Sequence, residues 1–332
     1  MPKVKITAVR QADYRDLQSL YENPIEHTCD VREGDTWISD GVNKPDGLCE
    51  SAWDSMKDFV RTLGAGGGDF FDGWMKDPRS AMISCNDGFR PVSFLIEAVE
   101  EESDYPYLYE THCHTLPVSK CAKVSAKDAV QFYKNLGYAG VFITNHFIDS
   151  YQDVDPNLSY AEKLRYFFSG YEEAKCVGNE IGIDVLCGVE MGYGGTHFLV
   201  YGLDEAWYLA HPEMMDMPMS KRLNFLRDSG ALVIQAHPCR ESNGIDHLRL
   251  FPRNIHGAEI YNANRADFEN EMGEAYVKNY GLIPFAGSDN HIGSAQRKLG
   301  GMRLKMPVKN EADFAARVKG GEALPFRRIL SE

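Results

Sequence analysis

The sequence contains no long hydrophobic run, and this absence excludes one class of protein. No stretch approaches about 18 consecutive apolar residues, so we expect neither a membrane-spanning helix nor a membrane partner. The first residues, MPKVKITAVRQADYRDL, lack the apolar core of a signal peptide, and we therefore expect a cytoplasmic protein.

Positive charge and paired cysteines are also scarce. The 35 Lys and Arg residues are outnumbered by 49 Asp and Glu residues, which gives a net charge of −14. Such a field repels nucleic-acid backbones, so long nucleic acids are not expected as partners. A small phosphorylated substrate stays compatible with this charge, because bound metal ions reverse the local sign. The eight cysteines form no CxxC pair, which argues against a disulfide framework or a zinc ribbon.

The chain is long enough for two domains, and an acidic segment, VEEESDYP (99–106), is the best candidate for a linker. Residues 1–100 predict a small α+β domain, with strands at 3–10, 81–86 and 92–99 and helices at 13–21 and 50–63. Three of the four tryptophans, Trp37, Trp53 and Trp74, lie in this region and are expected to anchor its core.

Residues 105–332 predict strands that mostly alternate with helices. The expected strands are 108–115, 140–146, 183–191, 197–203, 231–238, 257–262 and 284–291. The expected helices are 125–138, 159–182, 219–230, 267–280 and about 310–319. This alternation predicts an α/β fold with a parallel sheet, closed or distorted into a barrel.

Histidines and carboxylates gather at the ends of these predicted strands. Five strands end in polar residues and a sixth begins with one, which together provide His112, His114, His146, Glu190, His197, His237, Asp289 and His291. The carboxyl ends of parallel barrel strands converge on one face, and residues at i and i+2 of a strand point to the same side. Imidazoles mixed with carboxylates suit Zn²⁺, Mn²⁺ or Fe better than Ca²⁺ or Mg²⁺. The other four histidines, His27, His211, His247 and His256, are expected to be ordinary core or surface residues.

The order and spacing of these motifs resemble the PHP (polymerase and histidinol phosphatase) family over about residues 107–295. The resemblance rests on His112-x-His114-Thr, Thr-Asn-His146, Glu190, His197, Ala-His237-Pro and Ser-Asp289-x-His291. It implies a distorted (β/α)7 barrel, a site for two or three divalent metal ions, and phosphoester hydrolysis. Residues 1–100 resemble a small uncharacterised bacterial domain through 33–41, 44–53 and 85–97, which implies no activity.

The sequence departs from the family pattern at two positions. The family commonly has Asp before the histidine that ends the second strand, where this chain has Asn145. It also often has an Asp or His ligand shortly after the first HxH motif, whereas here Cys121 is the only plausible donor between Thr115 and Val124. A thiolate would favour Zn²⁺ or Fe over Mn²⁺, and without that ligand a third ion would be held weakly, which is our expectation.

These observations lead to a metal-dependent phosphoesterase as the main hypothesis. Metals held by His112, His114, Glu190, His237 and Asp289 would activate a hydroxide that attacks phosphorus. Arg240, close to His237, is the expected catalytic group that grips phosphate oxygens. Two alternatives stay open: a metal-binding scaffold without turnover, whose N-terminal region binds a partner, and an amidohydrolase-like enzyme acting on C–N bonds.

Overall fold

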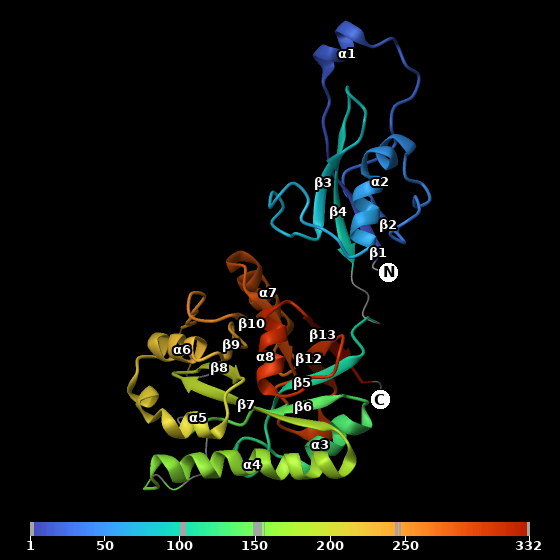
Figure 1. The fold of residues 1–332 in the computed structure, drawn as a ribbon. Coiled ribbons are helices and arrows are strands. Elements are labelled where there is room, and N and C mark those ends of the chain that lie inside the picture. The colour runs from blue at the N-terminus through green and yellow to red at the C-terminus, as the bar shows by residue number, and fades with distance from the viewer. Residues whose placement is uncertain are drawn as a thin grey trace. The chain divides into compact units, whose positions relative to one another are not determined.

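The computed structural model describes residues 3–99, 104–148, 155, 157–242, 245 and 247–330. The chain forms two compact units, Met1–Asp104 and Tyr105–Glu332, which are described separately below (Figure 1). Residues 100–103, in the middle of the predicted linker, lie outside the described residues.

The first unit is a small antiparallel sheet with a helix packed on it. Its strand order is β2-β1-β4-β3, formed by Lys3–Gln11 (β1), Thr36–Ser39 (β2), Ser80–Ser84 (β3) and Val92–Val99 (β4). Its helices are Arg15–Tyr21 (α1) and Glu50–Gly64 (α2). Alternate residues of β1 and one face of α2 form the core, which includes Val4, Ile6, Met56 and Val60. The short strand β2 was missed in the sequence.

The tryptophan prediction for this unit holds only in part. Trp53 is 7% exposed and belongs to the core, and Trp37 packs against that core. Trp74 is 81% exposed, so its assignment to the core was wrong. Trp74 follows a turn in which Asp69, Phe71 and Asp72 all have positive φ. Among the aromatic residues that the structure describes, its ring contacts only Phe71.

The second unit is built on one nine-stranded sheet of order β11-β10-β9-β8-β7-β6-β5-β12-β13. The strands are Tyr107–Cys113 (β5), Gly140–Ile143 (β6), Asp184–Tyr193 (β7), Thr196–Tyr201 (β8), Leu232–Ala236 (β9), Gly257–Asn262 (β10), Ile283–Gly287 (β11), Lys298–Leu304 (β12) and Ala323–Ile329 (β13). The helices are Ala126–Asn135 (α3), Tyr160–Ile181 (α4), Glu205–Ala210 (α5), Met219–Asp228 (α6), Asp267–Tyr280 (α7) and Glu311–Lys319 (α8), with short 3-10 turns at Pro212–Asp216 and Gly293–Ala295.

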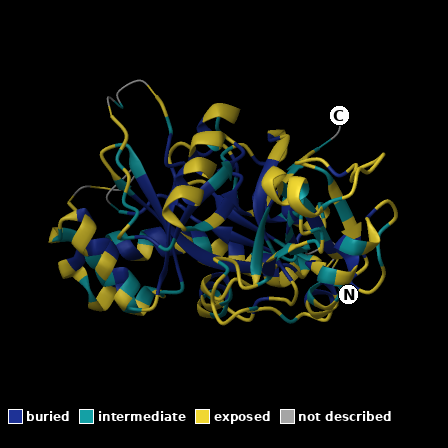
Figure 2. Ribbon diagram, turned by 90° about the horizontal axis from the view of Figure 1, so that it is seen from above, coloured by how far each residue is buried: buried dark blue, intermediate teal, exposed yellow. Residues whose placement is uncertain are grey.

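The seven strands β5 to β11 curl into the predicted distorted barrel, which is nearly closed. At the closing edge, His114 N–H donates to Asn290 O at 3.0 Å and Asn290 N–H donates to His112 O at 3.1 Å. These bonds join the carboxyl ends of the first and last barrel strands. The strands are largely buried, and exposed residues gather on the helices and loops around them (Figure 2).

The expectation of a parallel sheet was wrong for β8. This strand is antiparallel to both β7 and β9, whereas β5–β7 and β9–β11 run parallel. The cause is the two-residue turn Gly194–Gly195, whose φ angles of +53° and +86° suit a tight hairpin. A hairpin of two residues can join only antiparallel strands.

Two further strands, β12 and β13, were also missed in the sequence. They pair with each other, and β12 runs antiparallel to β5. The sequence of β12, KLGGMRL, contains two glycines and therefore has little strand character of its own. The glycines are needed because backbone passes close by: a Cβ at Gly300 would lie 2.7 Å from Gly287 O.

Each unit has its own hydrophobic core, and the barrel unit contains three clusters of buried side chains. Among the described residues, none of the helices combines the length and the apolarity needed to cross a bilayer.

We predict that a fragment beginning at Asp104 folds without the first unit, because these three clusters lie wholly within Tyr105–Glu332. The fragment should show one cooperative thermal transition and native-like near-ultraviolet circular dichroism. Aggregation, or a spectrum without tertiary signal, would mean that the first unit is required for folding of the barrel.

Candidate metal centre

The eight predicted ligands come together at one edge of the barrel. Each comes from a strand end or from the residues just after it: β5 provides the HxH pair, β7 and β8 provide Glu190 and His197, and the segments after β6, β9 and β11 provide the rest. Seven of the eight are buried, and His291 is partly exposed. His211 and His256 lie elsewhere: His211 contacts Glu213, and His256 Nδ1 accepts a hydrogen bond from Val233 N–H.

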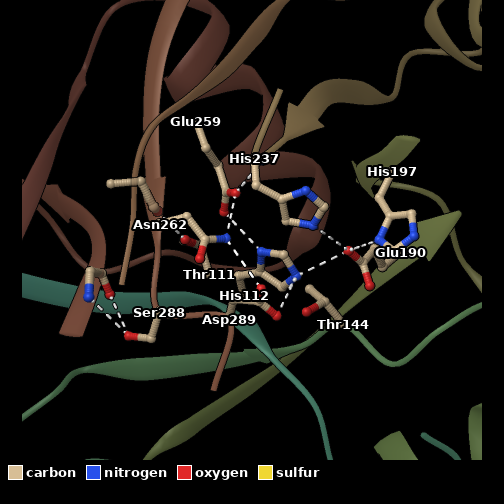
Figure 3. A network of polar contacts seen from close by, with 12 residues as sticks. Thr111, His112, Thr144, Glu190, His197, His237, Glu259, Asn262, Ser288 and Asp289 are labelled. Atoms are coloured by element: carbon tan, nitrogen blue, oxygen red, sulfur yellow. Dashed lines mark hydrogen bonds and ion pairs between the residues drawn. The ribbon is translucent and has the colours of Figure 1, made fainter. Parts of the chain in front are cut away.

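Glu190 faces the imidazoles of His112, His197 and His237 (Figure 3). Its Oε1 is 3.3 Å from His112 Nε2, 2.9 Å from His197 Nδ1 and 3.4 Å from His237 Nε2. Its Oε2 is 3.3 Å from His114 Nε2 and 2.6 Å from His146 Nδ1. One carboxylate therefore faces five imidazoles, and it could be shared between cations that they hold.

Asp289 approaches the same cluster from the closing edge. Its Oδ1 lies 3.5 Å from His112 Nε2, 3.4 Å from His114 Nε2 and 3.3 Å from His291 Nδ1. Asp289 and His237 have φ angles of +51° and +29°, a region that residues other than glycine rarely adopt. Such strain is typical of functional sites, where the surrounding structure holds a side chain in place.

A second carboxylate, Glu259 on β10, fixes the orientation of His112. Its Oε1 lies 2.8 Å from His112 Nδ1, and its Oε2 accepts hydrogen bonds of 2.8 Å from His237 N–H and from Asn262 Nδ2. An ionised carboxylate only accepts, so Nδ1 of His112 must carry a proton. This leaves Nε2 as the atom that could bind a metal ion. We missed Glu259 in the sequence, where the only signal was an acidic residue inside an otherwise buried strand.

Ser119 and Asn145 do the same for His114. Ser119 Oγ donates to Asn145 Oδ1 at 2.8 Å and accepts from His146 N–H at 3.0 Å. Because its one proton is used, it must accept from His114 Nδ1, 3.2 Å away. Nε2 of His114 is thus the ligand atom. Asn145 Oδ1 also accepts from Thr115 N–H, so this residue supports the site rather than acting as a ligand.

The donor set fits divalent cations. The Nε2 atoms of His112 and His114 are buried, and neither has a hydrogen-bond partner within the part of the chain that the structure describes. Three groups have ligand atoms within 4.8 Å of one another: His114 with His146 and His291, His112 with His114 and Glu190, and His146 with Glu190 and His197. Orphaned buried nitrogen atoms that face carboxylates need a positive charge between them.

The pKa shifts show the same demand for positive charge. Burial alone would raise the pKa of Glu190, but the imidazoles of His197, His146 and His112 hold this pKa well below its usual range. Burial opposes protonation of His146, yet Glu190 and Cys121 raise its pKa to about 10. Protons on histidine thus balance the carboxylates, and a cation would displace those protons on binding.

Cys121 lies beside this centre. Burial would raise the pKa of its thiol, but hydrogen bonds from His146 and His291 lower the pKa to about 6. The thiol and both imidazoles line a cavity of about 220 Å³ that opens onto the predicted ligands.

The same cavity is lined by two arginines, Arg240 and Arg265. Arg240 was expected here, whereas Arg265, three residues beyond the end of β10, was missed. The Nε atoms of both guanidinium groups are buried and have no hydrogen-bond partner among the described residues. Two guanidinium groups that line one small cavity are suited to an anion with several oxygens.

Comparisons with known proteins support the fold. No model of a known protein family matches the chain, and no curated protein matches it. A two-domain protein from Bacteroides vulgatus, which contains a predicted PHP-like metal-dependent phosphoesterase, has a similar structure with a TM-score of 0.52. The identity is 14%, over 69% of this chain and 67% of that protein. An amidohydrolase from Chromobacterium violaceum, solved with sulfate and no metal, is 14% identical over 65% of this chain and 97% of its own length, with a TM-score of only 0.42. The first likeness confirms the PHP-like fold that the sequence motifs implied.

We predict that Glu259→Gln weakens metal binding by about 10–100-fold, the usual effect of losing a partner of a metal ligand. Both carboxylate oxygens accept hydrogen bonds, so the amide NH₂ of Gln must face a donor, whichever way it turns. Competition with a chromophoric chelator measures the affinity. Glu271→Gln, an exposed change on α7, is the matched control. Equal affinities for both variants would mean that Glu259 does not support His112.

Proposed function

We propose that this chain is a metal-dependent hydrolase of phosphoesters, acting on a small phosphorylated metabolite or nucleotide. The observation that carries this proposal is one cavity in which four histidines and two carboxylates meet two arginines whose buried Nε atoms lack protein partners among the described residues. The ligand set suits two or three ions of Zn²⁺, Mn²⁺ or Fe.

The residues divide into those that hold metal and those that hold substrate. His112, His114, Glu190, His237 and Asp289 are the proposed ligands of the main sites, and His146, His197 and His291 extend the set. Bound divalent cations supply Lewis acidity, which makes water a stronger nucleophile and balances charge on phosphoryl oxygens.

Arg240 and Arg265 are proposed to bind the phosphoryl group. A guanidinium presents a planar fork that matches two oxygens of a phosphate, and burial of its Nε raises the value of each hydrogen bond. Arg240 is held next to the ligands, because its N–H donates to His237 O at 3.0 Å. The two arginines therefore position phosphorus beside the metal ligands and exclude water from that side.

The size of the cavity supports a small substrate. The cavity has a volume of about 220 Å³, which accommodates a phosphoryl group and little more. The rest of the substrate would therefore project out of the cavity. The net charge of −14 supports the exclusion of long nucleic acids.

Release of phosphate from a panel of phosphorylated metabolites, with Mn²⁺, Zn²⁺ or Fe²⁺ added to metal-free protein, tests the proposal. Activity should disappear on chelation and return with metal. Full activity in protein shown to be metal-free would contradict it. Tight metal binding without turnover on any ester would instead favour the non-catalytic scaffold, and hydrolysis of amides alone would favour the amidohydrolase.

We predict that Arg240→Lys and Arg265→Lys each lower kcat/KM by about 1.5–3 kcal/mol, the range for hydrogen bonds to charged groups. This corresponds to about 10–150-fold. Lysine keeps the charge but loses the planar fork. Arg253→Lys, an exposed change in the same unit, should leave kcat/KM unaltered. If the two cavity variants behave like this control, the arginines do not grip phosphate.

A further inference from the structure

The turn that leads from β5 into α3 holds Cys121 in a fixed place beside the metal centre. Ser119 N–H donates to Thr115 O at 3.0 Å, and Ser119 Oγ is bonded to the His146 backbone. Two residues after Cys121, Lys123 N–H donates to His291 O at 2.7 Å. The backbone on both sides of the cysteine is thus tied to the histidines that its side chain faces.

The imidazoles around Cys121 form one of the groups able to hold a cation. His114, His146 and His291 offer ligand atoms within 4.8 Å of one another. The ring of His114 lies between the other two, with centroids 4.2 Å from His291 and 4.4 Å from His146. The Cys121 thiol is hydrogen-bonded to the rings of His146 and His291. The Cys121 sulfur therefore lies beside the rings of His146 and His291, at the edge of this group.

The surroundings of Cys121 differ from those of cysteines that only fill space. Cys113 and Cys187 are buried members of hydrophobic clusters. Cys121 lines a polar cavity instead, together with His146, His291 and other charged residues. Imidazole nitrogen and thiolate sulfur are the usual ligands of Zn²⁺ in proteins.

We propose that Cys121, as a thiolate, completes a metal site with His146 and His291, and that this site selects Zn²⁺, Co²⁺ or Fe²⁺ over Mn²⁺. The inference deepens the proposed function and rests on its metal centre. Sulfur is a soft ligand that Mn²⁺ binds poorly, which gives the preference. The thiol proton passes to solvent as the sulfur–metal bond forms. A tightly held ion at this place replaces the weakly held third ion that the sequence alone suggested.

Titration of the metal-free full chain with Co²⁺ under reducing, oxygen-free conditions tests this assignment. A thiolate bound to Co²⁺ adds near-ultraviolet charge-transfer absorption that imidazole and carboxylate ligands do not give. We expect this band in the wild type and in Cys176→Ser, an exposed change on α4. We expect the band to be lost in Cys121→Ser. The affinity of this site for Co²⁺ should also fall by at least about 10–100-fold, because that is the usual effect of losing a residue that only supports a metal ligand.

A second variant separates the sulfur from the mere presence of a ligand. Cys121→Asp should keep a filled site without the charge-transfer band and should shift its preference from Zn²⁺ toward Mn²⁺. A wild-type spectrum without the band, or a band that survives in Cys121→Ser, would overturn the assignment.

Phosphoester hydrolysis, measured separately, distinguishes this failure from failure of the proposed function. If the protein shows the thiolate band but hydrolyses no phosphoester, the proposed metal site is supported and only the proposed function is contradicted. If the protein hydrolyses phosphoesters but shows no thiolate band, only the proposed role of Cys121 is contradicted. If no Co²⁺ binds at all, both proposals fall.

Discussion

The barrel depends on neutralising two carboxylates that are buried among imidazoles. Glu190 and Asp289 have almost no access to water, and an uncompensated buried carboxylate costs several kcal/mol. Their oxygens therefore determine where the positive charge must be, and five imidazole rings surround Glu190 alone. Protons can supply that charge, but a divalent cation supplies more of it from one position. The strands bring these groups together at some cost, visible as the positive φ angles of His237 and Asp289.

The support around the centre explains why it is preorganised. Glu259 fixes the ring of His112 from β10, and Ser119 fixes His114 from the turn after β5. Each contact protonates Nδ1 and leaves Nε2 as the ligand atom, so the choice of tautomer is made before any ion arrives. Asn145 also supports these histidines, because its amide oxygen accepts hydrogen bonds from Ser119 Oγ and from Thr115 N–H. An aspartate at 145 would accept the same two hydrogen bonds. Asn145 therefore keeps both of these hydrogen bonds and carries one negative charge less than aspartate.

The parts of the site that could be predicted are those that follow from the two-residue period of a β-strand and from the positions where the strands end. The pairs His112/His114 and Asp289/His291 are visible because residues at i and i+2 of a strand share a face. Glu259 was missed because it lies inside β10 rather than at its end, and only the fold shows which imidazole it meets. Arg265 was missed because it lies in a loop whose path depends on β10 and α7. The antiparallel course of β8 could have been predicted from Gly194–Gly195, a hairpin signal that the expectation of a parallel sheet concealed.

The two arginines solve an electrostatic problem that the composition creates. A chain with a net charge of −14 repels anions at long range, so an anionic substrate must find a local reversal of sign. Divalent cations held by the proposed ligands would give part of that reversal, but the six histidines would then be neutral ligands and contribute none. Arg240 and Arg265 both line the cavity, and a guanidinium is a cation that suits a phosphate. They come from the segments after β9 and β10, which are neighbours in the sheet, so the curvature of the barrel brings the loops to one rim. The same geometry that buries the carboxylates therefore places fixed positive charge where a phosphate would have to enter.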